Sequence, residues 1–203
     1  MELDLKHVTY QGPPIDDLAT QERLPAEYRG VLEEINGLIE FGGGLHVRGA
    51  CKHPVWHALS TVWTGELALH ALYPAVRATD IPFGEDALGD QFFLRDGVVY
   101  RLWGETGEVE SQACDLLNFL RAAQANPVEY LSLHPLIQFH NEGGTLEPGQ
   151  LLSACPPFCV KESGAGVSLR AIPATERIAF LADFARQVGN LPDDTTFRIE
   201  IVD

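Results

Sequence analysis

Two strand-like segments joined by Asp96-Gly97 constrain the fold of this chain more than any other feature. Residues 91–95 and 98–102 are rich in aromatic and β-branched side chains, and an Asp-Gly pair readily adopts the backbone angles of a two-residue hairpin turn. A second turn, Glu105-Thr106-Gly107, precedes another short strand-like segment at residues 108–110. The sequence therefore predicts an antiparallel meander near the middle of the chain.

Helix-like periodicity flanks this predicted meander. Pro25 suits a first helical turn, the apolar residues after it recur at the spacing of one helix face, and Asn36-Gly37 is a typical helix end. Two short helical pieces are expected within residues 55–72. Asp115 is expected to cap a further helix that ends at Asn126-Pro127. Together these features predict the α+β class, with a mainly antiparallel sheet packed against helices.

The last third of the chain has a different pattern. Pro and Gly interrupt residues 127–149, which marks a candidate junction. Residues 167–172 have an extended pattern, Thr175 is expected to cap a helix that ends at Gly189, and apolar and charged residues alternate over residues 197–201. The sequence therefore predicts a C-terminal β-α-β extension.

Length and composition agree with one domain that carries such an extension. The chain has 203 residues, of which 45% are apolar, so it can form a sizeable core. We divide it into an α+β domain of residues 1–126 and a β-α-β extension of residues 127–203 that packs on the first domain.

The charge balance argues against one class of function. The 29 acidic residues outnumber the 14 basic ones, which gives a formal net charge of −15. Such a surface repels nucleic acid and anionic membranes and attracts basic partners. Solubility alone also accounts for the acidity, so the charge does not by itself require a partner. We expect no direct binding to nucleic acid.

Targeting and membrane signals are not visible in the sequence. Met1-Glu2-Leu3-Asp4 has neither a basic nor an apolar stretch of a signal peptide, and no apolar run approaches the roughly 20 residues of a membrane span. Cys155 and Cys159 are separated by Pro-Pro-Phe, whose extended form would hold their Cα atoms about 12 Å apart, too far for a disulfide. We therefore expect a cytoplasmic protein with reduced thiols and no membrane insertion.

Five segments between Leu24 and Glu110 form an ordered set. They are Leu24-Pro25-x-x-Tyr28 leading to Asn36-Gly37, then Gly42-Gly43-Gly44, Asp80-Ile81-Pro82-Phe83-Gly84-Glu85-Asp86-Ala87-Leu88-Gly89-Asp90-Gln91-Phe92-Phe93, Asp96-Gly97-Val98-Val99-Tyr100-Arg101-Leu102 and Glu105-Thr106-Gly107-Glu108. In order and spacing they resemble the SUKH superfamily, over about half of the chain. That superfamily includes bacterial immunity proteins that neutralise toxins, a protein that associates with the SecY translocon, and fungal regulators of cell-wall synthesis.

The resemblance implies a SUKH-like α+β domain that binds another protein, without catalysis or a cofactor. It also implies pairing with a toxin, often a nuclease. Nucleases have basic clefts that hold phosphates, so an acidic protein suits such a partner. We expect an immunity protein that binds a basic toxin. The alternatives are a regulatory scaffold of the cell-wall or secretion machinery and a metal-dependent enzyme.

The acidic segment Glu85-Asp86-x-x-x-Asp90 is the first candidate site for a protein partner. It is expected in a loop before a strand, with Trp103 and Glu105 in a nearby turn, and aromatic anchors ringed by charge are typical of protein interfaces. A structural alternative is that Asp86 and Asp90 accept hydrogen bonds from turn amides while Trp103 lies in the core. The same carboxylates could also serve as a general acid and base, which requires two carboxyl groups of different pKa at a fixed separation.

His46, Cys51, His53 and His57 form the most metal-like cluster in the sequence. His53 and His57 lie four residues apart, the spacing of two ligands on one helix face, but Pro54 lies between them. The spacing matches neither a zinc finger nor HExxH, and the sequence also lacks the common phosphate-binding loops and the GxSxG nucleophile motif. We expect half-buried histidines without a metal, and the four residues remain the alternative metal site.

Overall fold

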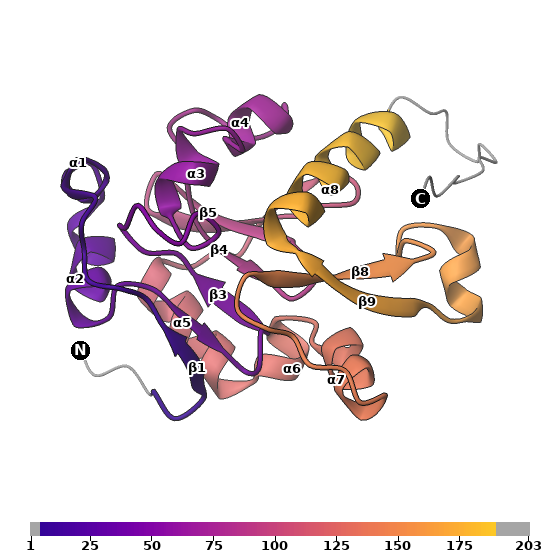
Figure 1. Ribbon diagram of the computed structural model, residues 1–203. Coiled ribbons are helices and arrows are strands. Elements are labelled where there is room, and N and C mark those ends of the chain that lie inside the picture. The colour runs from indigo at the N-terminus through magenta and orange to yellow at the C-terminus, as the bar shows by residue number, and fades with distance from the viewer. Residues whose placement is uncertain (1–4, 190–203) are drawn as a thin grey trace.

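A seven-stranded antiparallel sheet forms the centre of the molecule (Figure 1). The computed structural model describes residues 5–189, and within them each strand of this sheet pairs with the next one along the chain. The strands are β1 (Val8–Gln11), β2 (Leu38–Glu40), β3 (Leu45–Val47), β4 (Ile81–Asp86), β5 (Gln91–Arg95), β6 (Val98–Leu102) and β7 (Val109–Ser111). A separate two-stranded hairpin follows, formed by β8 (Gln150–Cys155) and β9 (Ser168–Pro173).

The hairpin expected at Asp96-Gly97 is confirmed. β5 and β6 pair across this turn, with Arg95 opposite Val98. Asp96 and Gly97 have φ angles of 53° and 80°, and a type I′ turn requires positive φ at both of its central positions. β7 continues the meander after the turn at residues 104–107, as the sequence predicts.

Helices lie around the sheet. In residues 5–189 they are α1 (Leu18–Glu22), α2 (Ala26–Glu34), α3 (Leu59–Trp63), α4 (Leu69–Leu72), α5 (Leu116–Ala125), α6 (Pro127–Tyr130), α7 (His134–Asn141), the short 3-10 helix η1 (Lys161–Ala165) and α8 (Ala174–Val188). Figure 1 shows α1 and α2 at one end of the molecule, and α8 with the β8–β9 hairpin at the other. None of these helices is long and apolar enough to cross a membrane.

Helices α2 and α5 cover one face of the sheet. Tyr28 and Leu32 of α2 and Phe119 of α5 belong to the same buried cluster as Phe83 and Phe92 of the sheet. Burial of each of these side chains stabilises the fold by about 2 kcal/mol relative to exposure. The helical periodicity after Pro25 therefore marks the side of α2 that meets the sheet.

The other face of the sheet is covered by α4, β8 and α8. Phe93 follows Phe92 in β5 and so points to this opposite face. It belongs to an apolar cluster that includes Leu69 of α4, Leu151 of β8 and Ile178 of α8. Residues from both sides of the expected junction thus share one core, and the α+β class is confirmed.

One expectation for the C-terminal part is wrong, and one strand there was not predicted. Helix α8 begins at Ala174 with Pro173 as its N-cap, so Thr175 lies inside the first turn and does not cap the helix. Pro173 has a φ of −54°, which suits the passage from β9 directly into a helix. Strand β9 pairs with β8, a strand that the sequence did not indicate because a long connection, rather than a tight turn, joins the two. The strand expected at residues 197–201 lies outside the described residues.

Candidate functional site

The acidic segment expected in an exposed loop is buried. Glu85 and Asp86 lie in β4 and Asp90 lies in the turn before β5, with relative exposures of 1%, 1% and 7%. This placement corrects the expectation for all three residues. β4 is flanked by β3 and β5, and the guanidinium groups of Arg48 and Arg101 lie buried next to the carboxylates. Burial is possible because these charges are paired.

Asp86 and Asp90 share the guanidinium group of Arg101. Arg101 Nη2 donates to Asp86 Oδ2 at 2.6 Å and to Asp90 Oδ2 at 2.7 Å. The remaining oxygens hold the backbone, because Asp86 Oδ1 accepts from the amides of Leu88 and Asp90, and Asp90 Oδ1 accepts from the amide of Gly104. Burial and the Asp90 carboxylate raise the pKa of Asp86 to about 7, against the opposing charge of Arg101. The structural alternative is therefore confirmed for the two aspartates.

Glu85 belongs to a second buried network. Its Oε2 accepts from Arg48 Nη2 at 2.6 Å and from Gln91 Nε2 at 2.9 Å, and its Oε1 lies 2.9 Å from His46 Nδ1. Burial alone would raise the pKa of Glu85, but Arg48 and His46 outweigh burial and lower it to about 2. Glu85 and His46 also border a cavity of about 250 Å³, whose wall includes Trp56.

The histidine rings extend this network. His46 Nε2 lies 2.9 Å from His57 Nδ1, and His57 Nε2 lies 3.0 Å from the carbonyl oxygen of Asn36. A carbonyl oxygen only accepts, so His57 Nε2 carries a proton and, in a neutral ring, His57 Nδ1 accepts one from His46 Nε2. A neutral His46 then turns a lone pair toward Glu85. The Glu85–His46 contact is thus a hydrogen bond only when the pair holds one further proton.

The four residues of the alternative metal site do not come together. His46 and His57 stack at 5.1 Å between ring centroids, but His53 is exposed, and it does not share a helix face with His57 because that segment is a turn before α3. Both nitrogens of His46 and His57 already face protein atoms. Among residues 5–189, no group of three or more His, Cys, Asp or Glu side chains is arranged to hold a metal ion. Cys51 is a buried free thiol.

Trp103 and Glu105 lie on a groove at the outer end of the Asp86–Asp90 network. We call it the Trp103 groove. It has a volume of about 500 Å³ and is lined by Leu88, Asp90, Arg101, Trp103, Glu105, Thr106, Glu108, Ser132, His134, Pro135, Phe158, Cys159 and Arg177. The groove brings together Asp90, Trp103 and Glu105 of the candidate site, whereas Glu85 and Asp86 do not line it.

The ring of Trp103 packs against the guanidinium group of Arg101. Trp103 is partly buried at the end of β6, and Arg101 Cζ lies 3.9 Å from its ring centroid, a cation–π contact. Phe158, from the connection between β8 and η1, has an exposed fraction of 38% and lies on the same groove. Sequence reasoning missed Phe158 and Arg177, and no local signal indicates them because they belong to segments far from Trp103 along the chain.

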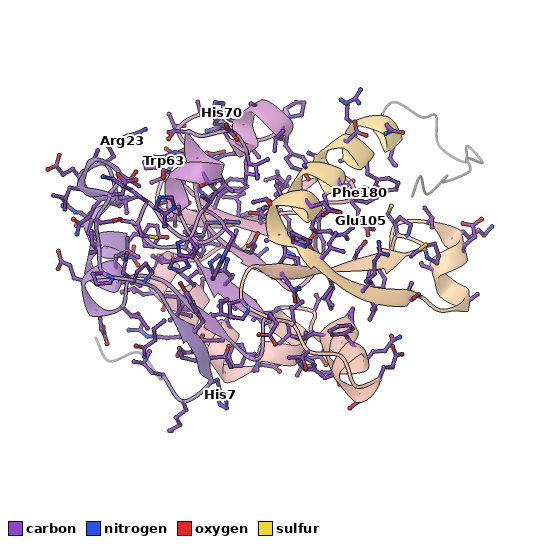
Figure 2. The ribbon with its side chains drawn as sticks, in the orientation of Figure 1. His7, Arg23, Trp63, His70, Glu105 and Phe180 are labelled. Carbon is purple, nitrogen blue, oxygen red and sulfur yellow. The ribbon has the colours of Figure 1, made fainter. Side chains whose placement is uncertain are left out.

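Glu105 lies beside α8 (Figure 2), where it links three parts of the chain. Its Oε1 is 3.6 Å from Arg177 Nη2, and its Oε2 accepts from the amide of Cys159 at 2.9 Å. Arg177 Nε donates to the carbonyl of Leu88. Within the described residues, Arg177 Nη1 and Glu105 Oε1 make no hydrogen bond. The lining of the groove therefore contains a long ion pair and unsatisfied polar atoms.

Comparisons with known proteins bear on the fold of this chain. No protein-family model matches the chain, and no curated protein sequence matches it. The chain is similar to the crystal structure of Atu4351 from Agrobacterium tumefaciens, with a TM-score of 0.55 and 16% sequence identity, over 88% of this chain and 86% of that one. At this identity the likeness concerns the fold alone.

Proposed function

We propose that this protein is a non-enzymatic protein-binding module of the SUKH type, and that it acts in the cytoplasm as an immunity protein against a basic, nuclease-type toxin. The ordered segments between Leu24 and Glu110 that resemble the SUKH superfamily support the class. The formal net charge of −15 supports a basic partner, because opposite charge accelerates encounter and favours the correct orientation.

The Trp103 groove is the observation that carries the proposal. It combines a half-buried tryptophan, positioned by Arg101, with the acidic side chains of Glu105 and Glu108. Protein interfaces concentrate their binding energy in aromatic anchors that sit in pockets with a polar rim. A tryptophan held by its neighbours loses little side-chain entropy when a partner binds.

The buried aspartates and histidines favour binding over acid–base catalysis. Asp86 and Asp90 share Arg101 and hold backbone turns. The ring nitrogens of His46 and His57 face protein groups. A general acid or base needs an atom within hydrogen-bond reach of its substrate, and these groups offer their atoms to the fold instead.

The test is capture followed by inhibition. The tagged protein is incubated with lysate of its source organism, and the retained proteins are identified at low and at high salt. A retained basic protein is then purified, and its nuclease activity is titrated with this protein. We expect the nuclease activity to fall to background at one equivalent of the parent protein. More than one equivalent of Glu108→Lys should be needed for the same inhibition. Glu110→Lys, which changes an exposed glutamate in β7 that does not line the groove, is the matched control.

Two results would contradict the immunity role. Recovery of cell-wall or secretion machinery in place of a nuclease would favour the regulatory scaffold. A captured nuclease that remains fully active with excess protein would show that binding does not neutralise it.

A further inference from the structure

The Trp103 groove also indicates what kind of segment it binds. Its apolar wall consists of four side chains from four separate parts of the chain, namely Leu88, Trp103, Pro135 and Phe158. A volume of about 500 Å³ lies within the range of sites that enclose a ligand or a large side chain. The groove is thus suited to an aromatic or long aliphatic anchor.

The floor of the groove is not positive, although it contains two arginines. Arg101 and Arg177 face three carboxylates, those of Asp86, Asp90 and Glu105. With Asp86 ionised the floor has one excess negative charge, and with Asp86 protonated its charges balance. Arg101 already donates to both aspartates, so an anion that binds at Arg101 would have to displace a buried ion pair.

The accessible charges on the groove are acidic. Glu108 is exposed. Glu105 retains 14% side-chain exposure, although its Oε1 is buried, and the side chains of Arg101 and Arg177 retain 5% and 1%. His134 is exposed as well, but its Nε2 lies 3.8 Å from a carboxylate oxygen of Glu129. A ligand therefore meets the Glu108 carboxylate before it meets either guanidinium group.

We propose that the Trp103 groove receives an extended segment of the partner protein in which an aromatic or long aliphatic residue is flanked by Lys or Arg. The apolar side chain lies against Trp103 and Phe158. The flanking cation pairs with the exposed carboxylate of Glu108, and the charge of Glu105 adds to the attraction. This inference rests on the proposed protein-binding function and adds to it the chemistry of the recognised segment.

The test uses two tripeptides of opposite charge, N-acetyl-Lys-Phe-Lys-amide and N-acetyl-Glu-Phe-Glu-amide. Each is titrated into ¹⁵N-labelled full-length protein, and the indole N–H signal of Trp103, assigned with Trp103→Phe, is followed by NMR. We expect the basic peptide to shift this signal and to bind at least tenfold more tightly than the acidic one. The double variant Glu105→Gln/Glu108→Gln should weaken the basic peptide about threefold to tenfold, and Glu110→Gln should leave it unchanged.

Three outcomes would overturn the inference. They are no shift with either peptide, equal or tighter binding of the acidic peptide, and a double variant that behaves like Glu110→Gln. Failure of the groove inference is distinguished from failure of the proposed function by measuring how tightly the captured partner binds the parent protein and the double variant. A partner that binds the double variant with full affinity leaves the function intact and removes the groove. Tighter binding of the basic peptide, in a protein that captures no partner, supports the groove inference and contradicts the proposed function.

Discussion

The Glu85 carboxylate and Nδ1 of His46 lie 2.9 Å apart in a buried contact. This contact lacks a proton when His46 and His57 are both neutral. The neutral rings of His46 and His57 bring two protons to three contacts, which end at the Asn36 carbonyl. Burial lowers the pKa of His46, although the hydrogen bond and charge of Glu85 partly oppose this effect. A third proton therefore binds to Nδ1 of His46 only at acid pH. As the pH rises, His46 loses this proton at a lower pH than an ordinary histidine does.

This proton makes the first prediction. In ¹⁵N NMR spectra, His46 should be protonated on both nitrogens at acid pH and lose the Nδ1 proton at a pH below 6.5. In Glu85→Gln the side-chain amide donates to His46 Nδ1 itself, so His46 should stay neutral to lower pH. A His46 titration that is the same in both proteins would contradict the hydrogen-bond chain.

The second prediction concerns stability at acid pH. Burial and the neighbouring His46 lower the pKa of His57 to about 4, whereas an unfolded histidine titrates near 6.5. Between these values the unfolded chain binds a proton that the folded chain does not, so stability falls as the pH falls. His57→Gln keeps a donor for Asn36 and should remove about 3 kcal/mol of this dependence, measured by urea unfolding at pH 7 and pH 4.

Asp86 changes the pH dependence of stability in the opposite direction from His57. The comparison of the parent protein with His57→Gln removes the contribution of Asp86. Its raised pKa means that the folded chain binds the extra proton between about pH 4 and pH 7, so its contribution to stability is lost as the pH rises. This contribution is the same in the parent protein and in His57→Gln. Unfolding curves that shift in parallel with pH in both proteins would exclude a buried neutral His57.

The third prediction tests the shared guanidinium group. Arg101→Met leaves the carboxylates of Asp86 and Asp90 buried without their cation, so we expect a loss of about 3–5 kcal/mol in the free energy of unfolding at pH 7. The loss should be smaller at pH 5, because protonation removes the unpaired charge. Arg170→Met, at an exposed position in β9, should change stability by less than about 1 kcal/mol.

The fourth prediction uses a thiol on the Trp103 groove. Burial and the charge of Glu105 raise the pKa of Cys159 to about 11, so little thiolate is present at pH 8.5. Glu105→Gln should speed the alkylation of Cys159 by iodoacetamide several-fold, as followed by mass spectrometry of the modified peptides. Cys155, also exposed, serves as the internal control. Equal acceleration at both cysteines would indicate local unfolding instead.

The fifth prediction compares two helix starts. Asp115 Oδ1 accepts from the amide of Asn118 at 2.8 Å, so Asp115→Ala should destabilise the protein by about 1 kcal/mol. Thr175→Ala should have little effect, because α8 begins one residue earlier and Pro173 holds the cap position. Equal losses in urea unfolding would restore Thr175 as a cap.

These two helix starts show which features of the fold can be predicted from local sequence. The turn at Asp96-Gly97 and the cap at Asp115 depend on interactions within about four residues, and both were predictable. The start of α8 was not, because Thr175 is a good cap in isolation and only the course of β9 into Pro173 moves the helix boundary. The side of α2 that packs was also readable, since helical spacing places apolar residues on one face.

The positions of the charges could not be read in this way. Glu85-Asp86 looks like an exposed acidic loop because local patterns contain nothing to neutralise it. Arg48 pairs with Glu85 from 37 residues away, and Arg101 pairs with Asp86 from 15 residues away. The Trp103 groove depends on still longer contacts, such as that of Arg177 with Leu88 across 89 residues. Short-range chemistry set the hairpin turn, the cap at Asp115 and the packed side of α2. The packing of distant segments set where α8 begins, which carboxylates are buried and where the surface is hollow. Burial and ion pairing depend on neighbours in space, which local patterns do not contain.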